Sequence, residues 1–145
     1  MPRVLLVEDE APIRAICRFN LELAGMEVLE AGDGRAGLER ARYEAPDVVV
    51  LGVMMPGLSG WRVAELLLND PATREIPIVF LTTRSDPRDR RYGLELGALD
   101  YITMPFDPHA LGTTLRELLA RVERGEREEL RRENLDELRA LESEA

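Results

Sequence analysis

Short polar groups follow two of the buried apolar runs in this sequence, and they are the residues best placed to do chemistry. Glu8 and Asp9 follow the first apolar run, and Thr82 and Thr83 follow the fourth. Proteins can hold Mg²⁺ with one or two carboxylates, water completing the shell. The same acidic pair would also be favourable at the positive end of a helix dipole, so a purely structural role stays open.

The elements that must position these residues follow from the hydrophobic pattern. Continuous apolar runs predict five buried strands, over residues 4–7, 26–30, 48–51, 76–81 and 99–103. Stretches of helical periodicity lie between them, and Asp33, Asp86 and Asp107 are typical helix N-caps. Alternating strands and helices with short links predict an α/β fold: a flavodoxin-like, doubly wound five-stranded parallel sheet in the order 2-1-3-4-5, with helices on both faces.

The functional crevice of such a sheet lies outside the carboxyl ends of its strands. The residues at those ends are Glu8, Asp9, Gly52, Thr82 and Met104. We therefore expect these five positions to meet at one edge of the sheet, and any function to lie there.

Four sequence blocks occur in order at these strand ends. They are Val7–Glu10, Leu51–Gly57, Leu81–Thr83 and Tyr101–Phe106. Each block is short, but together they closely resemble the motif blocks of response-regulator receiver domains, the CheY-like domains of two-component signal transduction. The resemblance covers roughly the first 120 residues, the size of a typical single domain. It implies a non-enzymatic signalling domain of the phosphorelay class.

The resemblance also implies a phosphorylation site in which two residues have been replaced. In the family, an aspartate that ends the third strand accepts a phosphoryl group from a histidine kinase, and a lysine after the fifth strand pairs with it. Those positions hold Gly52 and Met104 here, and the chain contains no lysine at all. Glycine offers no nucleophile, and a thioether supplies no cation. We therefore expect an atypical pseudo-receiver with no catalytic residue.

The other positions of the family's site are present. They comprise the Mg²⁺ ligands Glu8, Asp9 and the backbone carbonyl of Met54, the switch residues Thr82 and Tyr101, and the cis proline Pro105. In the family the hydroxyl contacts the phosphoryl group, and the aromatic side chain turns inward on activation. Weak or vestigial Mg²⁺ binding is the only cofactor interaction expected.

The two replacements are electrostatically coupled. An ordinary empty receiver site sums three carboxylates and one ammonium to about −2, and Glu8 with Asp9 alone also gives about −2. Loss of the lysine alone would have crowded three carboxylates together. We expect the flexible Met104 side chain to lean over Gly52 and partly plug the former phosphate site. The alternative is that Met104 points to solvent and water fills the space.

Two segments are expected along the chain: a receiver domain over residues 1–122, and a charged helical extension of its last helix over 123–145. The extension has few apolar residues, and these keep no heptad register for more than about two turns: Leu130, Leu135, Leu138 and Leu141. A solvated extension is favoured. A short coiled coil, or a linker to a further output domain, stays open.

Charge and composition exclude several function classes. A net charge of −9 argues against nucleic-acid binding. No apolar run approaches the length of a membrane span, and the N-terminus has no signal-peptide pattern, so a cytoplasmic location is expected. The one cysteine, Cys17, has helical apolar spacing and should lie in the core, whereas His109 should lie at the surface.

We expect the chain to act by protein–protein interaction, through the face of the fourth helix, fifth strand and fifth helix, as a monomer or weak homodimer. That face forms charged symmetric dimers in the family's DNA-binding members, but Ala110 and Thr114 replace two of the charged positions here. Two alternatives stay open. One is a conventional phosphorelay receiver with Asp9, Ser59 or Thr83 as surrogate acceptor, and the other is the regulatory part of a longer response regulator.

Overall fold

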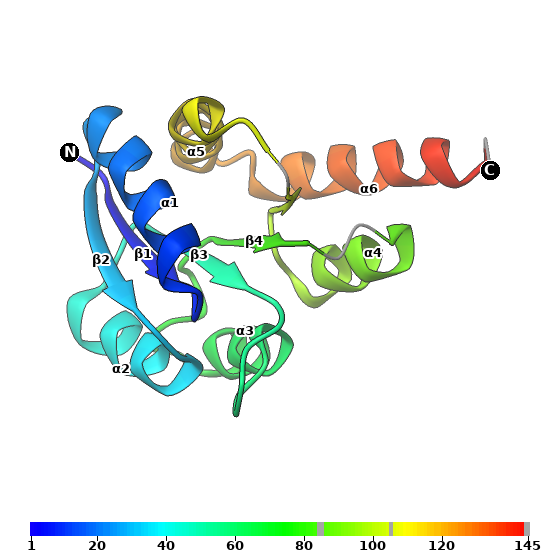
Figure 1. The fold of residues 1–145 in the computed structure, drawn as a ribbon. Coiled ribbons are helices and arrows are strands. Elements are labelled where there is room, and N and C mark those ends of the chain that lie inside the picture. Colours follow the sequence, from blue (N-terminus) through cyan, green and yellow to red (C-terminus); the bar gives the residue numbers. More distant parts are fainter. Residues whose placement is uncertain (84–85, 105, 144–145) are drawn as a thin grey trace.

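The computed structural model describes residues 1–83, 86–104 and 106–143, and these form one sheet surrounded by helices (Figure 1). In chain order the elements are β1 (Arg3–Val7), α1 (Ala11–Leu23), β2 (Glu27–Ala31), α2 (Gly34–Glu44), β3 (Val48–Gly52), α3 (Gly60–Asn69), β4 (Ile78–Thr82), α4 (Pro87–Leu96), β5 (Asp100–Thr103), α5 (Pro108–Glu123) and α6 (Arg127–Ser143). No helix in the described part of the chain is long and apolar enough to cross a membrane.

The sheet confirms the predicted fold. All strands are parallel, in the order β2-β1-β3-β4-β5. Helices α1 and α5 cover one face, and α2 and α3 cover the other (Figure 1). The central strand β3 is buried along its whole length, as the uninterrupted apolar run over residues 48–51 predicts. Cys17, on the inner face of α1, is fully buried in the core, and burial raises the pKa of its thiol to about 11.

Aspartate caps begin three of the helices, as the sequence predicts. Asp33, Asp86 and Asp107 each accept a hydrogen bond from a backbone N–H two or three residues further on, at 2.8–3.0 Å. In α4 and α5 the first helical residue is a proline, whose missing N–H would have had no partner in the helix. These caps fix where each helix leaves the carboxyl edge of the sheet.

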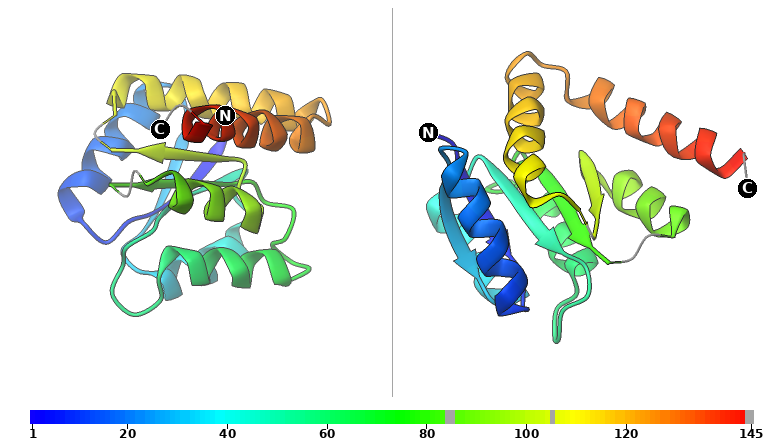
Figure 2. Two further views of the ribbon diagram at one scale, coloured as in Figure 1. Left: turned by 90° about the vertical axis from the view of Figure 1, so that its right-hand side faces the viewer. Right: turned by 45° about the horizontal axis from the view of Figure 1, so that its top comes forward.

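The C-terminal segment differs from the expected extension of the last helix. Helix α5 ends at Glu123, and the chain turns at Gly125, whose φ of +77° favours glycine. Helix α6 then runs back across the β5 side of the molecule, against α4 and α5 (Figure 2). Leu138 is buried there, so one side of this otherwise largely exposed helix packs on the domain. A domain boundary at residue 122 stays a prediction.

A close backbone approach holds the loop between β3 and α3 against the sheet. The Gly60 N–H donates to the Val53 carbonyl at 2.8 Å, and a Cβ at position 60 would overlap the carbonyl oxygen of Gly52. Backbone atoms cannot move aside as a flexible side chain can. Glycine at position 60 is therefore required if α3 is to begin directly beneath the end of β3.

Substitution of Gly60 by alanine should destabilise the fold by about 3 kcal/mol, because the new methyl group meets backbone and not a movable side chain. Gly32→Ala is the matched control, since its Cβ would make only an ordinary 3.6 Å contact with Arg14, and it should change stability by less than about 0.5 kcal/mol. Urea unfolding measures both. Equal stability losses for the two variants would contradict this account of the close approach.

Candidate functional site

The carboxyl ends of the strands gather around a small cavity of about 90 Å³. Its lining comes from the ends of β1, β3, β4 and β5 and the loops after them: Glu8, Glu10, Val53, Met54, Leu81, Thr82, Thr83 and Met104. Parallel pairing brings these segments together, since Gly52 lies opposite Leu81 and Thr82 lies opposite Thr103. The crevice that the fold predicts is therefore present, and it is lined by the predicted residues except Asp9 and Gly52, which adjoin its lining.

The Glu8 carboxyl group occupies the space next to Gly52. A Cβ built at position 52 would lie only 2.6 Å from Glu8 Oε2. The other oxygen, Oε1, accepts a hydrogen bond from the Glu10 N–H at 3.2 Å. The backbone of Glu8 is held too, because its carbonyl accepts from Arg14 at 2.7 Å. Glu8 is only 5% exposed, so the acidic group that the sequence places at the strand end is folded inward.

Burial raises the pKa of the Glu8 carboxyl group from its ordinary 4.5 to about 7. The hydrogen bond from the Glu10 N–H lowers this pKa in part, and the neighbouring Asp9 raises it through its charge and a side-chain hydrogen bond. The two adjacent carboxyl groups therefore behave as a close pair, in which the buried member holds a proton more tightly than a free glutamate.

Met104 lies between the cavity at the strand ends and an apolar groove beside it. Its half-buried side chain packs on the apolar cluster under α1 and α5, and it lines a groove of about 170 Å³ with Ile13, Cys17 and Phe106. It also borders the cavity beside Glu8. The group directly beside Gly52 is the Glu8 carboxyl, and Met104 borders the same cavity, so partial plugging of the site by Met104 stays a prediction. β1, which Glu8 follows, is adjacent to β3, whereas β5, which Met104 follows, lies two strands away.

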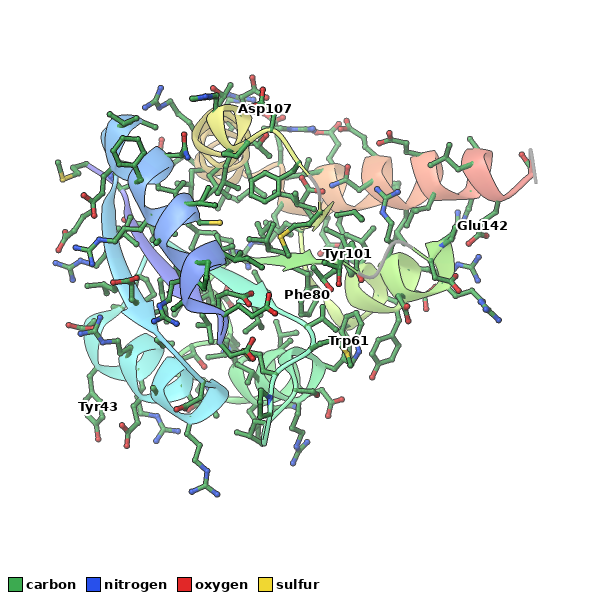
Figure 3. The ribbon with its side chains drawn as sticks, viewed as in Figure 1. Tyr43, Trp61, Phe80, Tyr101, Asp107 and Glu142 are labelled. Carbon is green, nitrogen blue, oxygen red and sulfur yellow. The ribbon has the colours of Figure 1, made fainter. Side chains whose placement is uncertain are left out.

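Tyr101 points into the molecule. It is 3% exposed, and its ring lies in an aromatic cluster with Trp61 and Phe80, at centroid distances of 6.2 and 5.9 Å (Figure 3). Trp61 in turn contacts Phe80 edge to face at 4.8 Å. Thr82 is buried at the end of β4, on the cavity wall. Pro105, predicted as a cis proline, lies outside the described residues.

Comparison with known proteins settles the family. The profile of the response regulator receiver domain matches residues 4–116. The chain belongs to this family. Over 120 residues it is 42% identical to the phosphate regulon transcriptional regulatory protein PhoB of Escherichia coli, and over 122 residues it is 42% identical to the probable transcriptional regulator ycf27 of Porphyridium aerugineum. These matches cover 83% and 84% of this chain.

Solved structures show the same fold. The receiver domain superimposes on the chemotaxis protein CheY4 of Vibrio cholerae with a TM-score of 0.75 and 33% identity, covering 81% of this chain and 98% of that one. For the signal receiver domain of a histidine kinase from Syntrophus aciditrophicus the TM-score is 0.77, with 32% identity over 86% and 94% of the two chains. The chain spans about half the length of the curated relatives, 52% of PhoB and 50% of ycf27.

The acidic pair of this receiver domain offers a reduced donor set for a metal ion. Glu8 and Asp9 supply two adjoining carboxyl groups, and Met54, assigned as a carbonyl ligand, lines the cavity. No group of three or more acidic, histidine or cysteine side chains that could hold a metal occurs in residues 1–83, 86–104 and 106–143. Two carboxylates, a carbonyl and water fit Mg²⁺, whose charge would offset the repulsion within the pair, but the third carboxylate of the family is missing.

Two features of the receiver domain escaped prediction from the sequence. Glu10 lines the cavity and fixes the Glu8 carboxyl through its backbone N–H. Helix α6 covers part of the face that the sequence assigns to a partner, since it packs on α4 and donates a hydrogen bond to the carbonyl of Leu99, next to β5. The role of Glu10 could not be predicted because every residue except proline has a backbone N–H. The packing of α6 could not be predicted because the face that packs is largely polar.

The raised pKa of Glu8 predicts a pH-dependent stability. The folded state holds the proton more tightly than the unfolded state, so this stabilisation is complete below about pH 4.5 and is lost as pH rises through about 7. Between pH 5 and pH 8, in a chelator, the wild type should therefore lose about 1–3 kcal/mol relative to Glu8→Gln, allowing for screening at the cavity mouth. Urea unfolding at both pH values measures this difference.

Glu117→Gln, on the exposed side of α5, is the control for loss of one carboxylate and should track the wild type. A constant difference between the wild type and Glu8→Gln across this pH range would show that Glu8 is not buried against Gly52.

Mg²⁺ binding should be weak, with a dissociation constant of about 1 mM or above, because one carboxylate of the family's set is absent. Isothermal titration calorimetry at pH 8 measures it, with Asp9→Asn as the variant that should lose the remaining affinity. A dissociation constant well below 1 mM would contradict this view of the donor set.

Proposed function

We propose that the chain is a pseudo-receiver: a two-component signalling module that works by protein–protein interaction without accepting a phosphoryl group. The observation that carries the proposal is the Glu8 carboxyl folded against Gly52, in the position that the family reserves for the acceptor side chain. Gly52 itself carries no carboxylate nucleophile, and the Glu8 carboxyl beside it is buried and accepts a hydrogen bond from the Glu10 N–H. Met104 supplies a thioether where a cation would be needed.

The position of Tyr101 supports this proposal. In the family an inward aromatic side chain at this position accompanies activation, and here the ring is buried against Trp61 and Phe80 while Gly52 offers no acceptor side chain. Helix α4 also contributes, because a Cβ at Gly93 would come within 3.0–3.1 Å of all three rings. The inward arrangement is therefore held by packing, which needs no phosphoryl group.

The face of α4, β5 and α5 is the proposed contact surface for a protein partner, with the chain otherwise monomeric or weakly dimeric. Surrogate acceptors are less favoured. Ser59 Oγ accepts the hydrogen bond that caps α3, at 3.3 Å from the Arg62 nitrogen, so its role in the fold is accounted for. Thr83 borders the cavity but has no carboxylate character.

A second proposal concerns the whole protein. Two of the relatives are named as transcriptional regulators, and this chain spans only about half of their length. The receiver domain would then be the regulatory part of a longer response regulator, with α6 adjoining the next domain. Size determination of the endogenous protein by immunoblot tests this independently of the phosphate site.

Phosphodonor treatment tests the pseudo-receiver directly. Incubation with acetyl phosphate and Mg²⁺ should leave the intact mass of the wild type unchanged. Gly52→Asp with Met104→Lys should gain one phosphoryl group, because the new carboxylate can displace the flexible end of Glu8 and the lysine restores the cation. Gly52→Asp alone should be phosphorylated less, since it places a third carboxylate beside Glu8 and Asp9.

Met104→Lys alone is the control and should stay inert, because it restores no acceptor. A phosphoryl group on the wild type would overturn the proposal, and peptide mapping would then identify the surrogate acceptor. A single Gly52→Asp variant as active as the double variant would show that Met104 has no part in the loss.

A further inference from the structure

Helix α6 lies over the surface that α4 and β5 present, and it does so from within the same chain (Figure 2). Its contacting residues recur at steps of three and four, which places them on one side of a helix. From the start of the helix to its end they are Arg127, which donates to the carbonyl of Glu75 before β4, and then Arg131, Asn134, Leu138 and Glu142. This stripe, hereafter the α6 docking face, is mostly polar.

Two side chains of the docking face satisfy backbone carbonyls of the surface beneath. Arg131 donates to the Leu94 carbonyl at 2.9 Å, near the C-terminus of α4, where a cation is also favoured by the helix dipole. Asn134 donates to the carbonyl of Leu99 at 2.7 Å, just before β5 begins. Without α6 these two carbonyls would lose the hydrogen bonds that Arg131 and Asn134 donate. The contact between α6 and this surface is therefore specific.

One apolar residue and one ion pair complete the contact. Leu138 is 1% exposed, whereas Leu141, a single turn further on, is 46% exposed. Glu142 pairs with Arg91 of α4 at the far end. At the near end, Arg121 of α5 pairs with Glu126 at 3.1 Å and with Glu133 of α6, which holds the turn at Gly125.

The contact between α6 and the rest of the domain is made largely by polar groups, unlike the apolar core. The described part of α6 buries one leucine completely and packs Leu130, half-buried, against the core; its other anchors are hydrogen bonds and ion pairs. Within the described residues, Glu142 Oε1 and Arg90 Nε are buried without a hydrogen-bond partner, which costs free energy in the docked state. Segments with few buried apolar contacts open at lower free energy than the sheet.

We propose that α6 is an intramolecular ligand of the α4–β5 surface, and that its undocking exposes this surface while the sheet stays folded. A partner that uses the surface must compete with α6. It must therefore present matching chemistry: an amphipathic helix with donors for the carbonyls of Leu94 and Leu99, an apolar side chain in place of Leu138, and a carboxylate for Arg91. This inference rests on the proposed function in one respect: it takes the α4–β5 surface as the surface that binds the protein partner.

Hydrogen exchange of the full chain, followed by mass spectrometry, tests the undocking. Leu138→Asp should raise exchange in α6 and in α4 by at least about tenfold, because a carboxylate cannot be buried there unpaired. Exchange in β1 and β3 should stay as in the wild type. Leu141→Asp is the matched control, the same substitution on the exposed side of the same helix, and should change neither region.

The double variant Arg131→Ala, Asn134→Ala keeps Leu138 and should open the same two helices. Unchanged exchange in α4 for both release variants would overturn the proposal, since α6 would then not be covering the surface. Increased exchange in β1 and β3 for both would overturn it as well, because α6 would be part of the core. Phosphodonor reactivity is not measured in this experiment, so it can fail while the pseudo-receiver proposal stands.

Discussion

The Glu8 carboxyl group and the missing side chain at Gly52 set the constraint on which the site depends. A carboxyl at the end of β1 has folded into the space beside β3, where a Cβ at position 52 would come within 2.6 Å of it. Burial at that place raises its pKa to about 7, so the site carries less negative charge near neutral pH than its acidic residues suggest. This lowers the need for a cation opposite, which is consistent with methionine at position 104 in a chain without lysine.

An aromatic cluster formed by α3, β4 and β5 is the second feature that packing holds in place. Tyr101, Phe80 and Trp61 pack against one another because α4 brings Gly93, without a side chain, against their rings. Helix α4 is in turn contacted by α6, which bonds the Leu94 carbonyl and pairs with Arg91. A continuous set of contacts thus runs from the C-terminal helix to the inward tyrosine. Ring packing accounts for the inward position of Tyr101 in the receiver domain.

The sequence was sufficient for the fold because the fold depends on periodicity and capping, which are local. The apolar run over residues 48–51 predicted the central strand, and Asp33, Asp86 and Asp107 predicted where helices begin. The strand ends also brought Glu8, Thr82 and Met104 to one cavity, as expected. What could not be predicted is which side chain fills a space. Glu8 rather than Met104 lies beside Gly52 because of rotamer choice and burial, which depend on the assembled sheet.

Helix α6 differs from the expected extension of the last helix for another reason. Its leucines have no heptad register, and the docking face depends on Arg131 and Asn134, whose partners are backbone carbonyls. Sequence patterns report apolar periodicity. They therefore do not predict a helix face that packs through polar side chains that donate hydrogen bonds. The turn at Gly125 was the one local sign that α5 does not continue.

If packing against Trp61 and Phe80 holds Tyr101, its ring should stay inward without a phosphoryl group or a metal ion. Solution NMR of the chain in a chelator, with aromatic side chains labelled, measures it through nuclear Overhauser effects between the rings. We expect strong cross-peaks from the Tyr101 ring to those of Trp61 and Phe80, with one set of Tyr101 signals that acetyl phosphate does not change. Absence of these cross-peaks, or a second set of Tyr101 signals from an outward ring, would contradict it.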